Sequence, residues 1–588
     1  MRIIALIGLL LSTVLSNAQN DTIYTSLSDT TLQLDQVIHV DLSNQTLSNL
    51  PAQLFQCLNL QTLNLSNNKL EELPDEIANL KKLEILNLDN NILEGLPKSF
   101  KDFKALKELY LNSAIRANSI NSIFGLFSKN TSLAKLELSN NSIIVLPNSI
   151  KSLKTLKHLE LSKNLLVQLP KNIAKMPMLR YIGLSYNPQL DFRSAFENIA
   201  PIKTLRHIDI SFNELSEVPK EVMDCRYIST LNIANNKITE LPDRMTQLIR
   251  MKTLRAENNE IQTISEAFSL LEGLQHWNIN NNKITALPGG IGDMAELQTL
   301  QANNNQLTDL PETIRQLREL KTLDLGKNEI NKLGFNIGSL RALNYLDLNG
   351  AQLSDLKAKG LAALTALEYL DLSNNPALNW EEIMPVINQL TALQTLQLAY
   401  NNIAQVPDAL AQCTQLSTID LSGNKGIATA SFWNTLATFS KLQALNLTAV
   451  ELNTIPDDIS NLQQLEYLNL DKNSIEILVE SIGKLTDLKV LSLNSTDLKT
   501  IPATTTQLKQ LEKLSLTNCM ELEIDALFTA IETIKLLELD LTSSKLAPLP
   551  EKIPSLLTQK ITLTNAIIEE DEVSRLKKEL PNTEIIYE

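Results

Sequence analysis

Cysteine is scarce in this chain, with four residues among 588. Three of them, Cys57, Cys225 and Cys413, each precede a repeated unit of the sequence by three residues, and many such units separate them. Units that stack at the spacing of neighbouring strands, about 4.8 Å, place these thiols far apart, whereas a disulfide needs Cα atoms within about 7 Å. The pattern excludes disulfides among these three, and we expect four free, mostly buried thiols.

Motifs of common catalytic and metal sites are also missing. The chain contains no HExxH, CxxC, GxSxG or GxxxxGK segment. Zinc needs three or four ligands that converge at about 2 Å, but only His158 and His207 lie within two repeated units of each other. All four histidines occupy the third position of a unit, at His39, His158, His207 and His276. The sequence therefore predicts no catalytic residue, no metal site and no cofactor.

Long apolar runs are absent except at the start of the chain. Arg2 is followed by an apolar run over residues 3–15 and by the small residues 16–18, as in a secretory signal peptide. This run is too short for a membrane span. We expect a signal peptide over residues 1–18 and export to the periplasm, the cell surface or the medium; the alternative is a buried N-terminal element.

Basic residues are fewer than acidic residues in this chain. The chain has 52 basic and 67 acidic residues and a formal net charge of −15, which becomes one unit more negative if Arg2 leaves with the leader. Such a charge opposes binding to nucleic acid or to an anionic membrane. It favours a basic partner, and we expect neither a nucleic-acid ligand nor a membrane span.

What the chain does have is a repeat with the template LxxLxLxxNxL. In LNLSNN, Leu63 and Leu65 alternate with Asn64, so a short strand points leucines to one side and a polar residue to the other. One unit cannot bury its own leucines, and stacked units with parallel strands share a continuous core. The 23 units start at residues 37, 60, 83, 106, 133, 156, 179, 205, 228, 251, 274, 297, 320, 343, 367, 393, 416, 442, 465, 488, 511, 536 and 558.

A second signal follows the strand. In 13 of the 23 units a Leu, Val or Ile is followed by proline, as at Pro74 in LEELPDEIANL, and proline suits an extended or 3₁₀ return. In this pattern the chain resembles leucine-rich repeat proteins, specifically the 23-residue LPxxI subclass that is bacterial and Shoc2-like. The resemblance implies an α/β solenoid, a curved horseshoe with a parallel sheet on its concave face and 3₁₀, extended and some helical segments on its convex face. It also implies protein binding through the concave face.

The expected domains are the signal peptide (1–18), an N-terminal cap (19–36), a solenoid of about 23 repeats (37–568) and a C-terminal helix-strand cap (569–588). In the last of these, Val573, Leu576 and Leu580 fall on one face of an amphipathic helix. The units that start at 106, 179, 367, 416 and 511 replace the proline signal with segments of helical periodicity, so we expect full helices there.

The ninth template position is occupied by asparagine in 15 units. Its amide both donates and accepts, so it can satisfy backbone groups that the turn leaves unpaired. This predicted ladder comprises Asn68, Asn91, Asn141, Asn164, Asn187, Asn213, Asn236, Asn259, Asn282, Asn305, Asn328, Asn375, Asn401, Asn424 and Asn473. Cys519 takes the same position as a structural stand-in, and we expect a looser stack around Val450 and Thr496.

Two groups of polar and aromatic residues are candidate binding surfaces. The first is acidic and aromatic and comprises Asp324, Tyr345, Asp347, Glu368, Tyr369, Asp371, Tyr400 and Asp420. The second is of mixed charge and comprises Arg180, Tyr181, Tyr186, Arg206, His207 and Phe212. Tyrosine is enriched at interfaces, so the first group predicts a basic or amphipathic protein or peptide ligand. The alternative is that these residues only keep the sheet soluble.

The function favoured by the sequence is that of an exported, non-enzymatic scaffold that binds a protein partner. A structural, adhesive or glycan-binding envelope protein is a second interpretation, and an intracellular signalling scaffold is a third. The repeats extend to about residue 568, and we expect no catalytic domain after them. The oligomeric state is left open.

Overall fold

The computed structural model describes residues 22–28, 32–127, 132–406, 410, 412–546, 549–551 and 553–587. The predicted signal peptide lies outside these residues. The chain forms two compact units, Met1–Glu260 and Ile261–Glu588, and each is described by itself. Across both units, 25 short strands form parallel ladders.

In the first unit every strand pairs in parallel with the next one along the chain. Each strand after β1 covers the third to fifth template positions, as the leucine pattern predicts. The strands are β1 (Ile23–Tyr24), β2 (His39–Asp41), β3 (Thr62–Asn64), β4 (Ile85–Asn87), β5 (Glu108–Tyr110), β6 (Lys135–Glu137), β7 (His158–Glu160), β8 (Tyr181–Gly183), β9 (His207–Asp209), β10 (Thr230–Asn232) and β11 (Thr253–Arg255).

The second unit repeats this arrangement, again with parallel neighbours in chain order. Its strands are β12 (His276–Asn278), β13 (Thr299–Gln301), β14 (Thr322–Asp324), β16 (Tyr345–Asp347), β18 (Tyr369–Asp371), β19 (Thr395–Gln397), β20 (Thr418–Asp420), β21 (Ala444–Asn446), β22 (Tyr467–Asn469), β23 (Val490–Ser492), β24 (Lys513–Ser515), β25 (Glu538–Asp540), β26 (Lys560–Thr562) and β27 (Glu584–Ile586). A separate two-stranded ladder joins β15 (Lys332–Leu333) to β17 (Asp355–Leu356).

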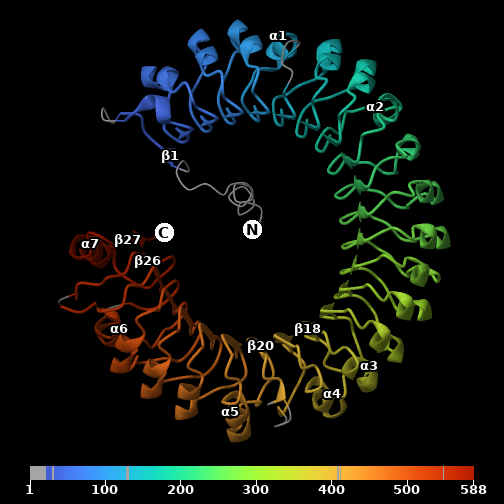
Figure 1. Ribbon diagram of the computed structural model, residues 1–588. Coiled ribbons are helices and arrows are strands. Elements are labelled where there is room, and N and C mark those ends of the chain that lie inside the picture. Colours follow the sequence, from blue (N-terminus) through green and yellow to red (C-terminus); the bar gives the residue numbers. More distant parts are fainter. Residues whose placement is uncertain are drawn as a thin grey trace. The chain divides into compact units, whose positions relative to one another are not determined.

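Short 3₁₀ helices form most of the returns between strands, and many begin directly after the predicted proline, as η4 does after Pro74. They are η2 (Leu34–Gln36), η3 (Ala52–Gln56), η4 (Asp75–Asn79), η5 (Lys98–Asp102), η6 (Ala117–Ser119), η8 (Asn148–Ser152), η9 (Lys171–Lys175), η10 (Lys220–Asp224), η11 (Asp243–Gln247), η12 (Glu266–Leu270), η13 (Ile291–Asp293), η14 (Glu312–Gln316), η15 (Phe335–Ser339), η17 (Asp457–Asn461), η18 (Glu480–Lys484) and η19 (Ala503–Gln507). Within each unit the helices lie on the side opposite the strands (Figure 1).

The α-helices are α1 (Ile120–Leu126), α2 (Phe192–Ile199), α3 (Ala358–Ala362), α4 (Trp380–Ile387), α5 (Ala430–Leu436), α6 (Ile524–Ile531) and α7 (Glu570–Glu579). Five of them, α1, α2, α4, α5 and α6, occupy the repeats that start at 106, 179, 367, 416 and 511, where helical periodicity predicts them. Helix α3 was not expected, because its repeat is only one residue longer than the norm.

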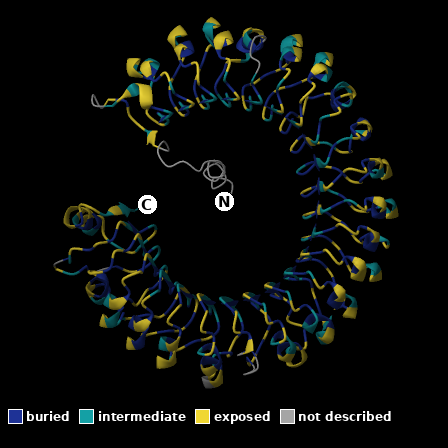
Figure 2. Ribbon diagram, in the orientation of Figure 1, coloured by how far each residue is buried: buried dark blue, intermediate teal, exposed yellow. Residues whose placement is uncertain are grey.

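The core lies between the strands and the return segments (Figure 2). The middle residue of nearly every strand is a buried leucine or isoleucine, as Leu63 and Leu86 show with no exposed surface. Burying one such side chain contributes roughly 1.5–3 kcal/mol. The residues on either side of it in the strand are only half-buried. We call the surface made by the third and fifth template positions the strand face.

The C-terminal segment closes the second unit. Val573, Leu576 and Leu580 are buried, and β27 pairs with β26. At the other end β1 pairs with β2. All four cysteines are buried and free, and burial raises the pKa of the Cys57 thiol to about 11 and that of Cys225 to about 12. These thiols are therefore protonated near neutral pH.

Candidate functional site

The asparagines of the ninth template position join consecutive repeats. Asn91 Nδ2 donates to the carbonyl groups of Leu88 (2.9 Å) and Leu65 (3.0 Å), the second of which belongs to the preceding repeat. Asn91 Oδ1 accepts the N–H of Leu70 at 3.0 Å. The same contacts recur along the ladder, for example at Asn164 and Asn328. These side chains are structural, because their hydrogen-bonding capacity is used inside the stack.

Other residue types continue the ladder near the C-terminus. Cys519 Sγ donates to the Leu493 carbonyl at 3.3 Å, and Ser544 Oγ donates to the Leu516 carbonyl at 2.6 Å. Thr496 Oγ1 donates to the carbonyl of Leu493 at 2.8 Å. Cys519 therefore has the neighbours of a ladder asparagine. Whether the stack is looser around Val450 and Thr496 remains a prediction.

A second polar ladder, at the fifth template position, was missed by the sequence reasoning. An oxygen of Asp347, Asp371 or Asp420 accepts the N–H of the residue two positions later, each at 2.8 Å. This contact is an Asx turn, in which a side-chain oxygen takes the place of a backbone acceptor. The recurrence of Asp and Asn at this position was the signal that could have revealed it. One carboxylate oxygen of Asp347 is consequently committed to the fold. In Asp371 and Asp420 the other oxygen is committed as well, because it accepts an amide N–H of Asn349 at 3.2 Å and of Asn446 at 2.9 Å, respectively.

The strands bring the centre of the first predicted patch together. Asp324, Asp347 and Asp371 are direct cross-strand partners on β14, β16 and β18. Tyr345 and Tyr369 are partners as well, and their rings stack with centroids 4.3 Å apart and planes 7° from parallel. The result is a row of three carboxylates beside a pair of stacked phenol rings. We call these five residues the acidic row.

Burial and neighbouring carboxylates raise the pKa values of several side chains in the acidic row. Burial, with Asp371 and Asp324 as negative neighbours, raises the pKa of Asp347 to about 6. The pKa of Asp324 is also raised, mainly by burial. Burial and the nearby carboxylates raise the pKa of Tyr345 to about 12 and raise that of Tyr369 further. A cationic group placed over the row would favour the charged carboxylates.

The remaining members of the first patch lie apart from this row. Glu368 is exposed just before β18, and Asp420 lies two strands beyond Asp371. Tyr400 is in the turn after β19, 51% exposed and at φ +55°. Its ring lies against Gly423, where an added Cβ would clash with it. The structure therefore does not place Tyr400 on the strand face.

The second predicted patch divides into two places. Arg180, Tyr181, Arg206 and His207 lie at the starts of β8 and β9. Burial, with the nearby Arg206 and His158 charges, lowers the pKa of His207. Tyr186 and Phe212 instead lie in the turns after these strands, where their exposed rings stack with centroids 4.2 Å apart. They border a hollow of about 310 Å³ that Pro188, Glu214, Asn235, Asn236 and Lys237 also line.

A polar network on β5 to β8 was not predicted. Glu137 pairs with Lys135 at 3.1 Å and with His158 at 3.3 Å. The His158 ring stacks on Tyr181 at 4.1 Å, and the Tyr181 hydroxyl donates to Glu160 at 2.8 Å. Burial raises the pKa of Glu137, but the hydrogen bond from His158 and the charge of Lys135 more than offset this and leave the pKa below its ordinary value. These contacts pair most of the charged side chains on this part of the strand face with one another.

The described ranges of the chain bear on metal binding and on membrane insertion. No three or more His, Cys, Asp and Glu side chains gather there in a way that could hold a metal ion. Among these same residues no helix has the length and apolar character needed to cross a membrane.

Family models for a leucine-rich repeat match residues 59–114, 131–188 and 318–376, and a model for a leucine-rich repeat region matches residues 428–560. No curated protein matches the chain.

Solved structures with the same architecture span almost the whole chain. A leucine-rich repeat protein of Leptospira interrogans is 26% identical, with 96% of this chain and 99% of that one covered and a TM-score of 0.37. The plant peptide hormone receptor RGFR1 in complex with RGF2 is 24% identical, with 94% and 91% covered and a TM-score of 0.51. A TLR13–ssRNA13 complex is 20% identical, with 87% and 88% covered and a TM-score of 0.51. The structural similarity to the RGFR1 and TLR13 complexes supports the solenoid fold.

Proposed function

Because the chain is a leucine-rich repeat protein, we propose that it is an exported, non-enzymatic scaffold that binds a protein or peptide through its strand face. The acidic row is the observation that carries this proposal. Three carboxylates in register and two stacked tyrosines are held on consecutive strands, and a rigid scaffold of this kind loses little entropy when it binds.

The chemistry of the row favours a basic segment as the ligand. An arginine or lysine side chain stacks on a tyrosine face and pairs with a carboxylate at the same time. It would also offset the burial and the neighbouring carboxylates that together raise the pKa of Asp347. The net charge of −15 steers such a ligand toward the protein and opposes nucleic acid. The peptide-bound plant receptor is similar in fold.

The test is selection of peptides from a random displayed library on a protein of residues 19–588. We expect a basic consensus, and we expect the triple variant Tyr345→Ala, Asp347→Ala, Tyr369→Ala to lose its binding. Tyr467→Ala, at the same template position on β22, is the matched control and should bind normally. No consensus, or equal binding by the triple variant, would remove the acidic row as the site.

Export is a separate part of the proposal with its own test. The apolar run over residues 3–15 and the small residues 16–18 support a cleaved leader. The N-terminus of the protein recovered from its native cells should begin at Gln19. An intact Met1 would support the alternative of an intracellular signalling scaffold.

One observation favours glycan binding as the alternative function. The stacked, exposed Tyr186 and Phe212 border a hollow with polar groups on its rim, and a flat aromatic surface with hydrogen-bonding neighbours suits a sugar ring. A panel of neutral oligosaccharides, tested against the protein and Phe212→Ala, decides this point. Binding that Phe212→Ala abolishes would favour the glycan alternative over a peptide ligand.

A further inference from the structure

A group of arginines lies away from the strand face, in the second unit. Arg315 and Gln316 are the last two residues of η14, and Ser339 is the last residue of η15 in the next repeat. Arg318 and Arg341 follow these helices, two residues after Gln316 and Ser339. The five residues line a hollow of about 590 Å³, which we call the arginine pocket.

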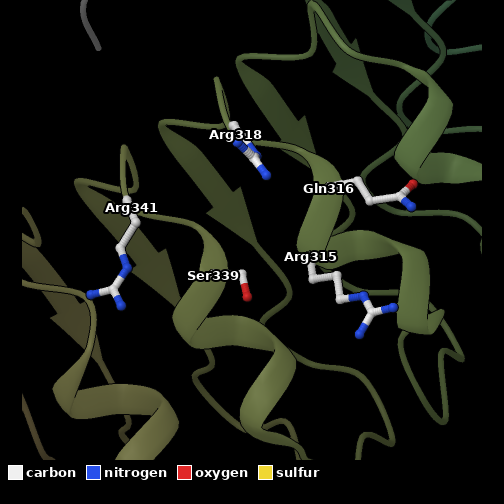
Figure 3. Close-up of a pocket in the computed structure, with 5 residues that line it drawn as sticks. All are labelled: Arg315, Gln316, Arg318, Ser339 and Arg341. Carbon is white, nitrogen blue, oxygen red and sulfur yellow. The ribbon is translucent and has the colours of Figure 1, made fainter.

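Figure 3 shows how the side chains are arranged. Arg318 and Ser339 extend into the space between the two repeats, Arg315 and Gln316 stand on one side of it, and Arg341 stands on the other. Serine is the short residue at the repeat position that glutamine holds one repeat earlier. Its small size leaves room between Arg318 and Arg341.

The arginines of the pocket form no ion pair with other described residues. In the described part of the chain, arginines form ion pairs at Arg116, Arg193, Arg255 and Arg575, and those of the pocket are not among them. Arg341 Nη1 donates to the Ala363 carbonyl at 2.6 Å, which anchors one end of its guanidinium.

Arg318 and Arg341 occupy equivalent positions in consecutive repeats, so two like charges are neighbours, and Arg315 adds a third. Like charges at this spacing repel each other, in a chain whose net charge is −15. A bound anion would remove that repulsion.

We propose that the arginine pocket binds an oxyanion, a phosphate or sulfate group of a ligand. Guanidinium groups present paired N–H donors that match such oxygens, and Gln316 and Ser339 add neutral donors. All five lining residues are exposed, so the hollow is open to solvent and a phosphate group on a larger ligand can reach it. The site lies outside the strand face, so it is independent of the peptide ligand proposed above.

The experiment is calorimetric titration with inorganic pyrophosphate at low ionic strength, using the protein of residues 19–588. We expect saturable binding, weakened about tenfold or more in Arg318→Gln/Arg341→Gln, since the variant loses two charged hydrogen-bond donors. The matched control is Arg226→Gln/Arg244→Gln, which removes the same charge from exposed arginines of the first unit and should bind as the parent does. Thermal unfolding verifies that both variants fold.

A second arm distinguishes a free phosphate from a lipid headgroup. Vesicles of phosphatidylcholine with phosphatidic acid present the same group on a surface, and co-sedimentation measures the protein bound to them. Binding of either probe that depends on Arg318 and Arg341 supports the site and identifies the source of the phosphate. Absence of binding to both probes, or equal binding by the pocket variant and its control, would overturn the proposal.

Discussion

At the scale of single residues, polar side chains in the repeat serve the fold before they serve a ligand. The ninth position joins repeats through Asn91 and its equivalents, and the fifth position closes an Asx turn through Asp347 and its equivalents. The structural role of the ninth-position asparagines was predicted from the sequence, because a side-chain amide both donates and accepts hydrogen bonds. The turn role of aspartate was missed because carboxylates on a sheet are equally consistent with solvation.

Asn164→Ala tests the asparagine ladder. The substitution leaves the Leu138 and Leu161 carbonyl groups and the Ile143 N–H without their side-chain partner inside the stack. Buried groups left unpaired cost about 1–3 kcal/mol, so the urea midpoint should fall accordingly. Asn172→Ala, which removes a surface amide that bonds Asn148, is the control. Equal midpoints for the two variants would contradict the ladder.

The raised pKa of Asp347 predicts that the stability of the protein depends on pH. Its folded-state pKa is raised to about 6 from 3.8, so the folded state holds more protons than the unfolded state between these values. Stability therefore falls as pH rises through this window. Asp347→Asn keeps an acceptor for the turn and removes the charge. The melting temperature of the variant, measured from pH 4 to pH 7.5, should decline less than that of the parent over the window; identical slopes would refute this assignment.

At the scale of elements, periodicity predicted most of the secondary structure. Leucine alternation predicted the strands, proline predicted the start of the 3₁₀ helices, and helical spacing predicted α1, α2, α4, α5 and α6. Periodicity did not predict helix α3, because the close packing of this helix on η15 depends on Gly338 and Gly360. A Cβ at Gly338 would lie 2.7 Å from the Gly360 carbonyl oxygen, and such a contact between repeats leaves no trace in local periodicity.

Leu576→Ala tests the C-terminal helix α7 as a cover for the last repeats. Leu576 is 1% exposed, and truncating a buried leucine costs about 2–5 kcal/mol. In a stack that is coupled only to its neighbours, the loss should be local. Hydrogen exchange should accelerate first in β26 and β27, while β12 and β13 keep their protection. Ser574→Ala, on the exposed side of α7, should leave exchange unchanged; uniform acceleration along the chain would contradict local coupling.

At the scale of the whole molecule, charge is the property that bears on partners. The net charge of −15 is spread over many exposed carboxylates, but the described structure also concentrates carboxylates in the acidic row and arginines in the arginine pocket. The first attracts cations and the second attracts anions. The composition alone predicts only the attraction of cations.

The salt dependence of binding tests the charge of the peptide ligand. If the selected peptide is basic, its dissociation constant should rise as sodium chloride increases from about 0.05 M to about 0.5 M, since the screening length shortens from beyond about 10 Å to a few ångströms. Fluorescence anisotropy of the labelled peptide measures this. A dissociation constant that does not change with salt would point to an apolar ligand.

The amino-acid sequence by itself determined the parallel repeat, the buried leucines, the asparagine ladder and six of the α-helices, because each depends on residues within one segment or at a constant spacing. Only the tertiary structure decided which exposed side chains meet. It stacked the rings of Tyr345 and Tyr369, set the ring of Tyr400 against Gly423, and gathered three arginines around one hollow. The physical reason is that such groupings depend on rotamers and on turns between repeats, where each side chain responds to neighbours that the repeat pattern does not specify.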